Sequence, residues 1–313
     1  MTVFLAMPAP AQGDAFPTRP VRIVPFGTSG GVIDGIARIY ADKLRERWKQ
    51  PVIVEARPGA SGTIAADFVA RSPADGHTIL FTLSLTHINN AFLQKSLPYD
   101  PFRDFEPLSQ LATGGPILIA PADAPFNTLQ ELVAHAKSRP AGVSFGTWGT
   151  GSSAHLFGEL LGRLSGAKFV HVPYKGEAAA HLDMFGRALD IAWANPGTAR
   201  GHLRSGKVKA IGLTGSRRLE VVPGVALFGE QGFAGFDLDS WAGTFAPAKT
   251  PKAVVDEIAR AFRDTTQMPE IRTRWVDLGF APLGNTPEEF TRNHRADFPK
   301  WGEIIKAAGV TPE

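Results

Sequence analysis

The sequence predicts an α/β protein of two lobes. Short apolar segments alternate with helix-periodic segments along the whole chain, as where residues 21–26 precede the helical spacing of Ile33, Ala37 and Leu44. This alternation is typical of parallel sheets whose two faces are covered by helices. No linker rich in proline, glycine or serine divides the 313 residues. We therefore expect two lobes joined by chain crossings near residues 111–115 and 236–243, rather than two domains in tandem.

The two crossings divide the chain into three parts. Residues 16–113 and 240–313 are expected to form the first lobe, and residues 114–239 the second. Hinged lobes of this kind can close over a ligand. Residues 1–15 are mostly apolar and include Ala9-Pro10-Ala11, which fits the cleavage rule of a signal peptide. They lack a positively charged start, so we interpret them as a signal-peptide remnant or as a disordered N-terminus.

Apolar runs mark the strands, and spacing and caps mark the helices. Strands are expected at residues 21–26, 51–55, 78–81, 116–120, 169–172, 190–193, 209–213 and 243–246, with a further strand beginning at Val143. Thr128 with Glu131, and Thr286 with Glu289, have the spacing of capping boxes for the helices that follow. Pro251 opens another helix at its first position, and Pro299 should kink the last helix.

Two glycine-rich loops each join a predicted strand to a predicted helix. They span residues 26–34 and 146–155. Glycine allows the backbone to approach a ligand closely, and the free amides at the start of a helix favour an anion. In open α/β sheets the ligand crevice lies beyond the carboxyl ends of the strands. Two such loops predict a small carboxylate that is held from both sides.

Composition excludes several classes of function. The chain has no cysteine, so it has no disulfide, thiolate zinc site or cysteine nucleophile. A net charge of +3 is too small to indicate nucleic-acid binding. The eight histidines show no helical pair and no H-E-x-x-H motif, so we expect neither a metal nor a cofactor. No run approaches the roughly 20 apolar residues that span a membrane.

Short motifs in a shared order connect the chain with a known family. They are Arg19-Pro20-Val21-Arg22, Val24-Pro25-Phe26 with Gly30-Gly31 and Asp34, Arg57-Pro58-Gly59-Ala60-Ser61-Gly62, Thr86-His87, Leu97-Pro98-Tyr99-Asp100, the stretch from Gly149 to Leu156, Val172-Pro173-Tyr174-Lys175-Gly176 and Ala246-Pro247. Through them the chain resembles the substrate-binding proteins of tripartite tricarboxylate transporters, also called the Bug family, from Phe16 to the C-terminus.

The resemblance implies a two-lobed periplasmic-binding-protein (Venus flytrap) fold with the ligand cleft between the lobes. It implies a monomer of the bacterial periplasm that captures a small carboxylate without catalysis. Its partner would be an inner-membrane transporter, or a sensor kinase. The resemblance also implies which residues contact the ligand: Phe26, Thr28, Ser29, Gly30, Gly31, Asp34, Ser84, Thr86, His87, Trp148, Gly149, Thr150, Gly151, Ser152, His155, Lys175, Trp193 and Asn195.

Three departures from the family pattern bear on the ligand. The first glycine loop is about one residue longer than usual. Ala194 stands where an acidic residue is frequent, which disfavours amino-acid ligands. Trp148 replaces a small residue and, with Trp193, can form an apolar or aromatic wall. These features shift the expected ligand towards apolar or aromatic carboxylates.

Several of these residues also have a structural interpretation. Asp34 can brace the first loop by accepting backbone amides, and His155 can order the second loop instead of contacting the ligand. Lys175 is either a point charge for a carboxylate or a solvated side chain. Both tryptophans can belong to the core.

A second function comes from the first glycine loop. Residues 27–31 match the G-x-S-x-G motif of serine hydrolases, between a strand and a helix as that motif requires. The alternative is therefore a hydrolase with Ser29 as nucleophile.

Overall fold

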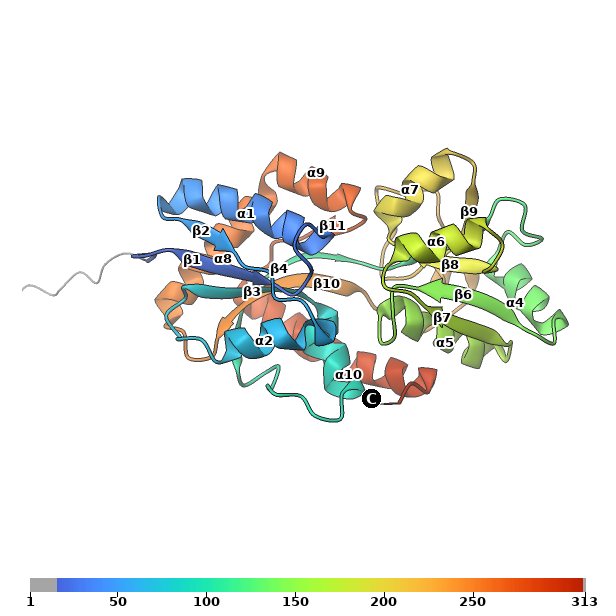
Figure 1. Ribbon diagram of the computed structural model, residues 1–313, viewed down its shortest axis with the longest axis horizontal. Coiled ribbons are helices and arrows are strands. Elements are labelled where there is room, and N and C mark those ends of the chain that lie inside the picture. The colour runs from blue at the N-terminus through green and yellow to red at the C-terminus, as the bar shows by residue number, and fades with distance from the viewer. Residues whose placement is uncertain (1–15, 312–313) are drawn as a thin grey trace, which may run out of the picture.

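Two sheets lie side by side in the computed structural model, which describes residues 16–311 (Figure 1). The first has six strands in the order β11-β4-β10-β3-β1-β2, and the second has five in the order β7-β6-β8-β5-β9. The strands of the first sheet are β1 (Val21–Pro25), β2 (Val52–Val54), β3 (Thr78–Leu83), β4 (Phe105–Gly114), β10 (Ser240–Pro247) and β11 (Ala281–Pro282). Those of the second are β5 (Ile117–Pro121), β6 (Val143–Thr147), β7 (Phe169–Pro173), β8 (Ile191–Ala194) and β9 (Val208–Leu213).

Both sheets are mixed, whereas the alternating pattern predicted parallel ones. β1 runs parallel to β2 and β3, and β6 runs parallel to β7 and β8. β10 is antiparallel to β3 and β4, and β5 is antiparallel to β8 and β9. β5 and β10 are the first strands after the two chain crossings. They enter their sheets from the side of the other sheet, and therefore run against their neighbours.

Helices cover both faces of each sheet (Figure 1). They are α1 (Val32–Trp48), α2 (Thr63–Ala70), α3 (Asn90–Leu93), α4 (Leu129–Ser138), α5 (Ser153–Ser165), α6 (Glu177–Phe185), α7 (Pro196–Arg204), α8 (Lys252–Gln267), α9 (Pro269–Asp277) and α10 (Pro287–Ala308). Short helical turns lie at Ala60–Gly62, Leu85–Asn89 and Gly229–Gln231. Among the helices of the described residues, none is long and apolar enough to cross a membrane.

Of the two predicted capping boxes, the one at α10 is complete and the one at α4 is not. Thr286 and Glu289 form a complete capping box at the start of α10. At α4 the Thr128 hydroxyl accepts from the Glu131 amide, but the Glu131 carboxylate accepts from the Asn127 amide instead of closing the box. α10 runs through Pro299 as one continuous helix.

The last helix, α10, connects the two halves of the structure. It packs on β4 of the first sheet and on α5, which covers the second sheet. Trp301 of α10 lies against Phe157 of α5, with ring centroids 5.4 Å apart. The Arg163 Nε atom of α5 donates to the Ala308 carbonyl at the end of α10, at 2.9 Å. The C-terminal segment therefore packs on the first sheet and also connects it to a helix that covers the second. The predicted signal-peptide remnant, residues 1–15, lies outside the described residues.

Candidate ligand-binding site

A cavity of about 420 Å³ lies between the two sheets. From elements of the first sheet it is lined by Val32, Ile33, Leu83, Ser84, Leu85, Asn89, Gly114, Ser240, Asp277, Leu278, Gly279 and Phe280. From the second it is lined by Pro116, Trp148, Ser152, Ser153, Glu177, Asn195, Pro196, Gly197 and Thr198, and Gly115 lies at the crossing. Many of these residues directly follow a strand, which is where open α/β sheets bind ligands.

Four helices begin at this cavity. Val32 and Ile33 start α1, Ser153 starts α5, Glu177 starts α6 and Pro196 starts α7. The first amides of an α-helix have no partner within the helix, and its N-terminal end carries a partial positive charge. No lysine or arginine is among the lining residues. Backbone amides, with their hydrogen-bond donors and partial positive charge, are therefore what the cavity offers to an anion.

The rest of the lining is largely apolar. It includes Leu83, Leu85, Trp148, Leu278 and Phe280. Val32 stands at the first position of α1 with 60% of its surface exposed, although helix starts more often carry polar residues. Apolar walls with a few placed polar groups are typical of small-molecule sites. The lining thus suits a ligand with an apolar body.

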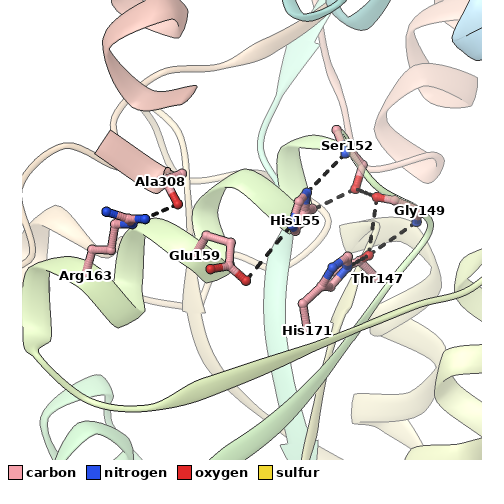
Figure 2. A network of polar contacts seen from close by, with 9 residues as sticks. Thr147, Gly149, Ser152, His155, Glu159, Arg163, His171 and Ala308 are labelled. Atoms are coloured by element: carbon pink, nitrogen blue, oxygen red, sulfur yellow. Dashed lines mark hydrogen bonds and ion pairs between the residues drawn. The ribbon is translucent and has the colours of Figure 1, made fainter. Parts of the chain in front are cut away.

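The second glycine loop is held by a buried histidine (Figure 2). His155 Nδ1 accepts a hydrogen bond from the Gly151 amide at 3.1 Å, which places the ring proton of the neutral imidazole on Nε2. The Ser152 hydroxyl donates to the Gly149 carbonyl at 2.6 Å and accepts from the His155 amide at 3.3 Å. The loop is therefore shaped by side chains behind it. The Ser152 hydroxyl takes up the His155 amide, so the amides of Ser153 and Ala154 are the ones that the start of α5 offers to a ligand.

A second histidine supports the first (Figure 2). The His171 ring stacks on His155 with centroids 3.9 Å apart, and its Nε2 lies 2.7 Å from the Thr147 hydroxyl. That hydroxyl oxygen also accepts from the Gly149 amide at 3.2 Å. Burial lowers the pKa of His155 and of His171 to about 4, so both rings are neutral at physiological pH.

The first glycine loop is braced by Asp34. This buried carboxylate accepts from the Gly30 amide at 2.9 Å and from the Arg38 guanidinium at 2.8 Å. The hydrogen bonds from Arg38 hold the pKa of Asp34 below its ordinary value. Asp34 is thus a fixed anion in the first turn of α1, behind the cavity wall.

The predicted ligand residues fall into separate groups. Ser84, Trp148, Ser152 and Asn195 line the cavity. Gly149, Thr150 and Gly151 form the loop that leads into the lining residue Ser152, and His155 lies behind them. Phe26, Thr28, Ser29, Gly30 and Gly31 are not among the lining residues. A turn closed by the Gly31 amide on the Thr28 carbonyl lets α1 present Val32 and Ile33 instead.

Other predicted residues lie in the core or in solvent. Trp193 is 1% exposed and stacks on Phe228, and His87 is fully buried against Phe245 at 4.0 Å. Thr86 is also buried, where its carbonyl accepts from the Tyr99 hydroxyl. Lys175 is exposed and lies outside the lining. Trp193 and His87 therefore place their rings in the core instead of in the cavity.

Sequence reasoning missed one wall of the cavity. Asp277, Leu278, Gly279 and Phe280 come from the end of α9 and the turn after it. They belong to no strand-to-helix loop, so the anion pattern could not indicate them. Gly279 carried the available signal, a glycine after a helix, but this marks only a helix end.

Comparison with known proteins shows the family to which the chain belongs. The family model described as the tripartite tricarboxylate transporter family receptor matches residues 36–310. The chain belongs to this receptor family. The structure of the periplasmic binding protein BugD is similar, with a TM-score of 0.81 and 32% identity over 95% of this receptor and all of BugD. The structure of R. palustris Rpa4515 with adipate has a TM-score of 0.84 and 29% identity over 95% of this receptor and 100% of that chain.

A third structure is that of MatC from Rhodopseudomonas palustris with bound malate. It has a TM-score of 0.78 and 31% identity over 93% of this receptor and 100% of MatC. The family and these neighbours are binding proteins, not enzymes, so the receptor is a substrate-binding protein and the serine-hydrolase alternative is unsupported. Within residues 16–311, Ser29 is exposed and has no hydrogen bond to a histidine or a carboxylate. The same residues hold no cluster of three or more potential metal ligands.

Proposed function

We propose that this receptor captures a small carboxylate with an apolar or aromatic body in the cavity between its sheets. The observation that carries this proposal is the cavity itself, which combines free helix amides with apolar walls and contains no cationic side chain. The relatives crystallised with adipate and malate support the carboxylate. Adipate and malate are the ligands of those relatives. The expected preference for an apolar body rests on Val32, Trp148 and Phe280 of this chain, which line the cavity.

In this proposal the carboxylate lies at the start of α5. Ser152 and Ser153 line the cavity there, and the first turn of α5 contains no acidic residue. By contrast, Asp34 lies in the first turn of α1. A carboxylate that accepts charge-assisted hydrogen bonds from amides at α5 therefore meets the least electrostatic opposition.

The proposed setting is the bacterial periplasm, where the monomeric receptor presents its ligand to an inner-membrane partner. The family description favours transporter subunits and hence uptake. The alternative role is sensing, in which a sensor kinase recognises the ligand-bound receptor.

Calorimetry with matched acids and esters tests the proposal. A thermal-shift screen of aromatic, aliphatic and hydroxy carboxylates first identifies a ligand. Its methyl ester is then titrated at the same pH and salt concentration. Loss of the charge should weaken binding about ten-fold to a hundred-fold, because hydrogen bonds to a charged group contribute roughly 1.5–3 kcal/mol. Equal affinity for acid and ester would contradict the proposal.

A further inference from the structure

Glu177 is one of the residues that line the cavity. Its Oε2 atom accepts from the Asn195 amide at 2.7 Å, and its Oε1 atom accepts from the Thr198 hydroxyl at 2.6 Å. Both donors belong to the start of α7. Glu177 therefore already occupies the positive end of that helix, which makes α7 a poor place for the carboxylate of a ligand.

The charge of Glu177 is not balanced by a neighbouring cation. Among residues 16–311, no lysine, arginine or histidine nitrogen lies within 4.0 Å of its carboxylate oxygens, so it is in none of the ion pairs found there. The other acidic lining residue, Asp277, is paired with Arg200 at 3.0 Å. Each oxygen of Glu177 accepts one hydrogen bond and has capacity for another. Among the described residues, Glu177 is therefore the acidic wall of the cavity: a lining carboxylate whose charge no ion pair neutralises and which can still accept a donor.

The acidic wall and the free amides approach the cavity from opposite faces of the second sheet. α6 and α7 cover one face and α5 covers the other (Figure 1). The first turn of α5 contains no acidic residue, whereas α6 begins at Glu177 itself. A ligand that spans the cavity would meet amide donors at one end and a carboxylate at the other.

We propose that Glu177 binds a hydrogen-bond donor at the end of the ligand remote from its carboxylate. This inference rests on the proposed function and narrows it to monocarboxylates that carry a hydroxyl or an ammonium group beyond an apolar body. A ligand with a second carboxylate at that end would place like charges together and is rejected.

Two ligand series that differ only at the remote group provide the test. On a benzoate scaffold the para substituents are methyl, hydroxyl, aminomethyl and carboxylate. On a six-carbon scaffold the compounds are hexanoate, ω-hydroxyhexanoate, ω-aminohexanoate and adipate. Each is titrated by calorimetry into the wild-type receptor, Glu177→Gln and Glu303→Gln. Glu303 is exposed on α10 and lies outside the lining, so it controls for loss of a negative charge.

In the better-bound series, the wild-type receptor should bind the hydroxyl or ammonium compound about ten-fold to a hundred-fold more tightly than the methyl compound, and the dicarboxylate least tightly. Tighter binding of the hydroxyl compound or of the ammonium compound identifies which donor the site takes. Glu177→Gln should abolish the ammonium preference and raise affinity for the dicarboxylate, and Glu303→Gln should change neither. A gain in dicarboxylate affinity cannot come from misfolding.

Two results would overturn the inference while leaving the proposed function intact. One is tight binding of terephthalate or adipate by the wild-type receptor. The other is equal affinity for the methyl and hydroxyl compounds that Glu177→Gln leaves unchanged. If no acid of either series binds while its methyl ester does, the proposed function fails as well.

Discussion

Arg200 of α7 and Asp277 of α9 form an ion pair between the two sides of the cavity, with nitrogen and oxygen 3.0 Å apart. Close beside it the backbones approach even more tightly. A Cβ atom added to Gly197 would lie 2.1 Å from the Asp277 carbonyl oxygen, and one added to Gly279 would lie 2.7 Å from the Gly197 amide nitrogen. Asn89 adds a third connection through its hydrogen bond to the Gly151 carbonyl at 3.1 Å. The two sides of the cavity, one from each sheet, are therefore in direct contact with each other.

The backbone contact at Gly197 should contribute more to ligand affinity than the ion pair does. Both charged side chains are about two-fifths exposed, and such pairs contribute only about 0–1 kcal/mol. We expect Arg200→Ala to weaken ligand binding less than about five-fold. Gly197→Ala should weaken it more than ten-fold, because the added methyl group holds the walls apart. Alanine favours a helix over glycine by roughly 1 kcal/mol, which offsets part of the unfolding stability that the lost contact between the walls costs.

Gly201→Ala is the matched control for this comparison. Gly201 lies in the same helix, and its added Cβ would meet nothing within 4 Å. Calorimetry and thermal unfolding on the three variants separate binding from stability. Wild-type affinity in Gly197→Ala would show that contact between the walls is not needed to hold the ligand.

Gly151 should resist substitution for a different reason. Its φ of 76° lies in the left-handed region, and an added Cβ would lie 2.8 Å from Leu93 Cδ1 of α3. Gly151→Ala should therefore cost roughly 1–2 kcal/mol of stability and should also lower ligand affinity. Gly31→Ala has an ordinary φ of −74°, although its added Cβ would lie 3.0 Å from the Thr28 carbonyl oxygen, so it should lose less stability than Gly151→Ala. Chemical unfolding of both variants tests this difference. Equal stability losses would mean that the left-handed backbone at Gly151 is not the cause.

The two stacked histidines predict a loss of stability in acid. The pKa of His155 and of His171 falls from 6.5 to about 4 on folding. The unfolded chain therefore binds protons at these two rings more readily than the folded protein does. The contribution of the neutral rings to the stability of the fold is complete above pH 6.5 and declines as the pH falls towards 4. Each neutral ring should contribute a slope of about 1.4 kcal/mol per pH unit in that range.

His155→Asn and His155→Phe separate the two roles of this ring. Asparagine keeps an acceptor near the position of Nδ1 but cannot stack on His171, whereas phenylalanine stacks and cannot accept from Gly151. We expect the asparagine variant to keep most of its ligand affinity at neutral pH and the phenylalanine variant to lose about ten-fold, the effect of one hydrogen bond. Unfolding titrations should show a shallower pH slope in both. An unchanged slope would mean that His155 is protonated in the folded protein.

The sequence indicated the parts of the candidate site that are built from neighbouring residues of the chain. A strand, a glycine loop and a helix follow one another within about fifteen residues, so the starts of α1 and α5 could be placed from pattern alone. The wall at Asp277 and Gly279 could not, because it meets Gly197 only through tertiary packing. The strand β4 was missed since Ser109 and Gln110 interrupt its apolar pattern. These buried polar groups are satisfied by the distant Asn285 and Asn293.

Trp148 provides the last prediction, which concerns the body of the ligand. Its side chain is partly buried and lines the cavity next to Ser152, at the start of α5. If the ligand is apolar or aromatic, Trp148 covers it, and truncation removes this surface without disturbing the free amides. Trp148→Ala should weaken binding of an aromatic carboxylate by about 2 kcal/mol, which is roughly thirty-fold. Binding of a small polar acid such as malate should change far less. Calorimetry with benzoate and malate on both proteins gives the ratio of the two affinities, and a ratio that the substitution leaves unchanged would argue against the apolar wall.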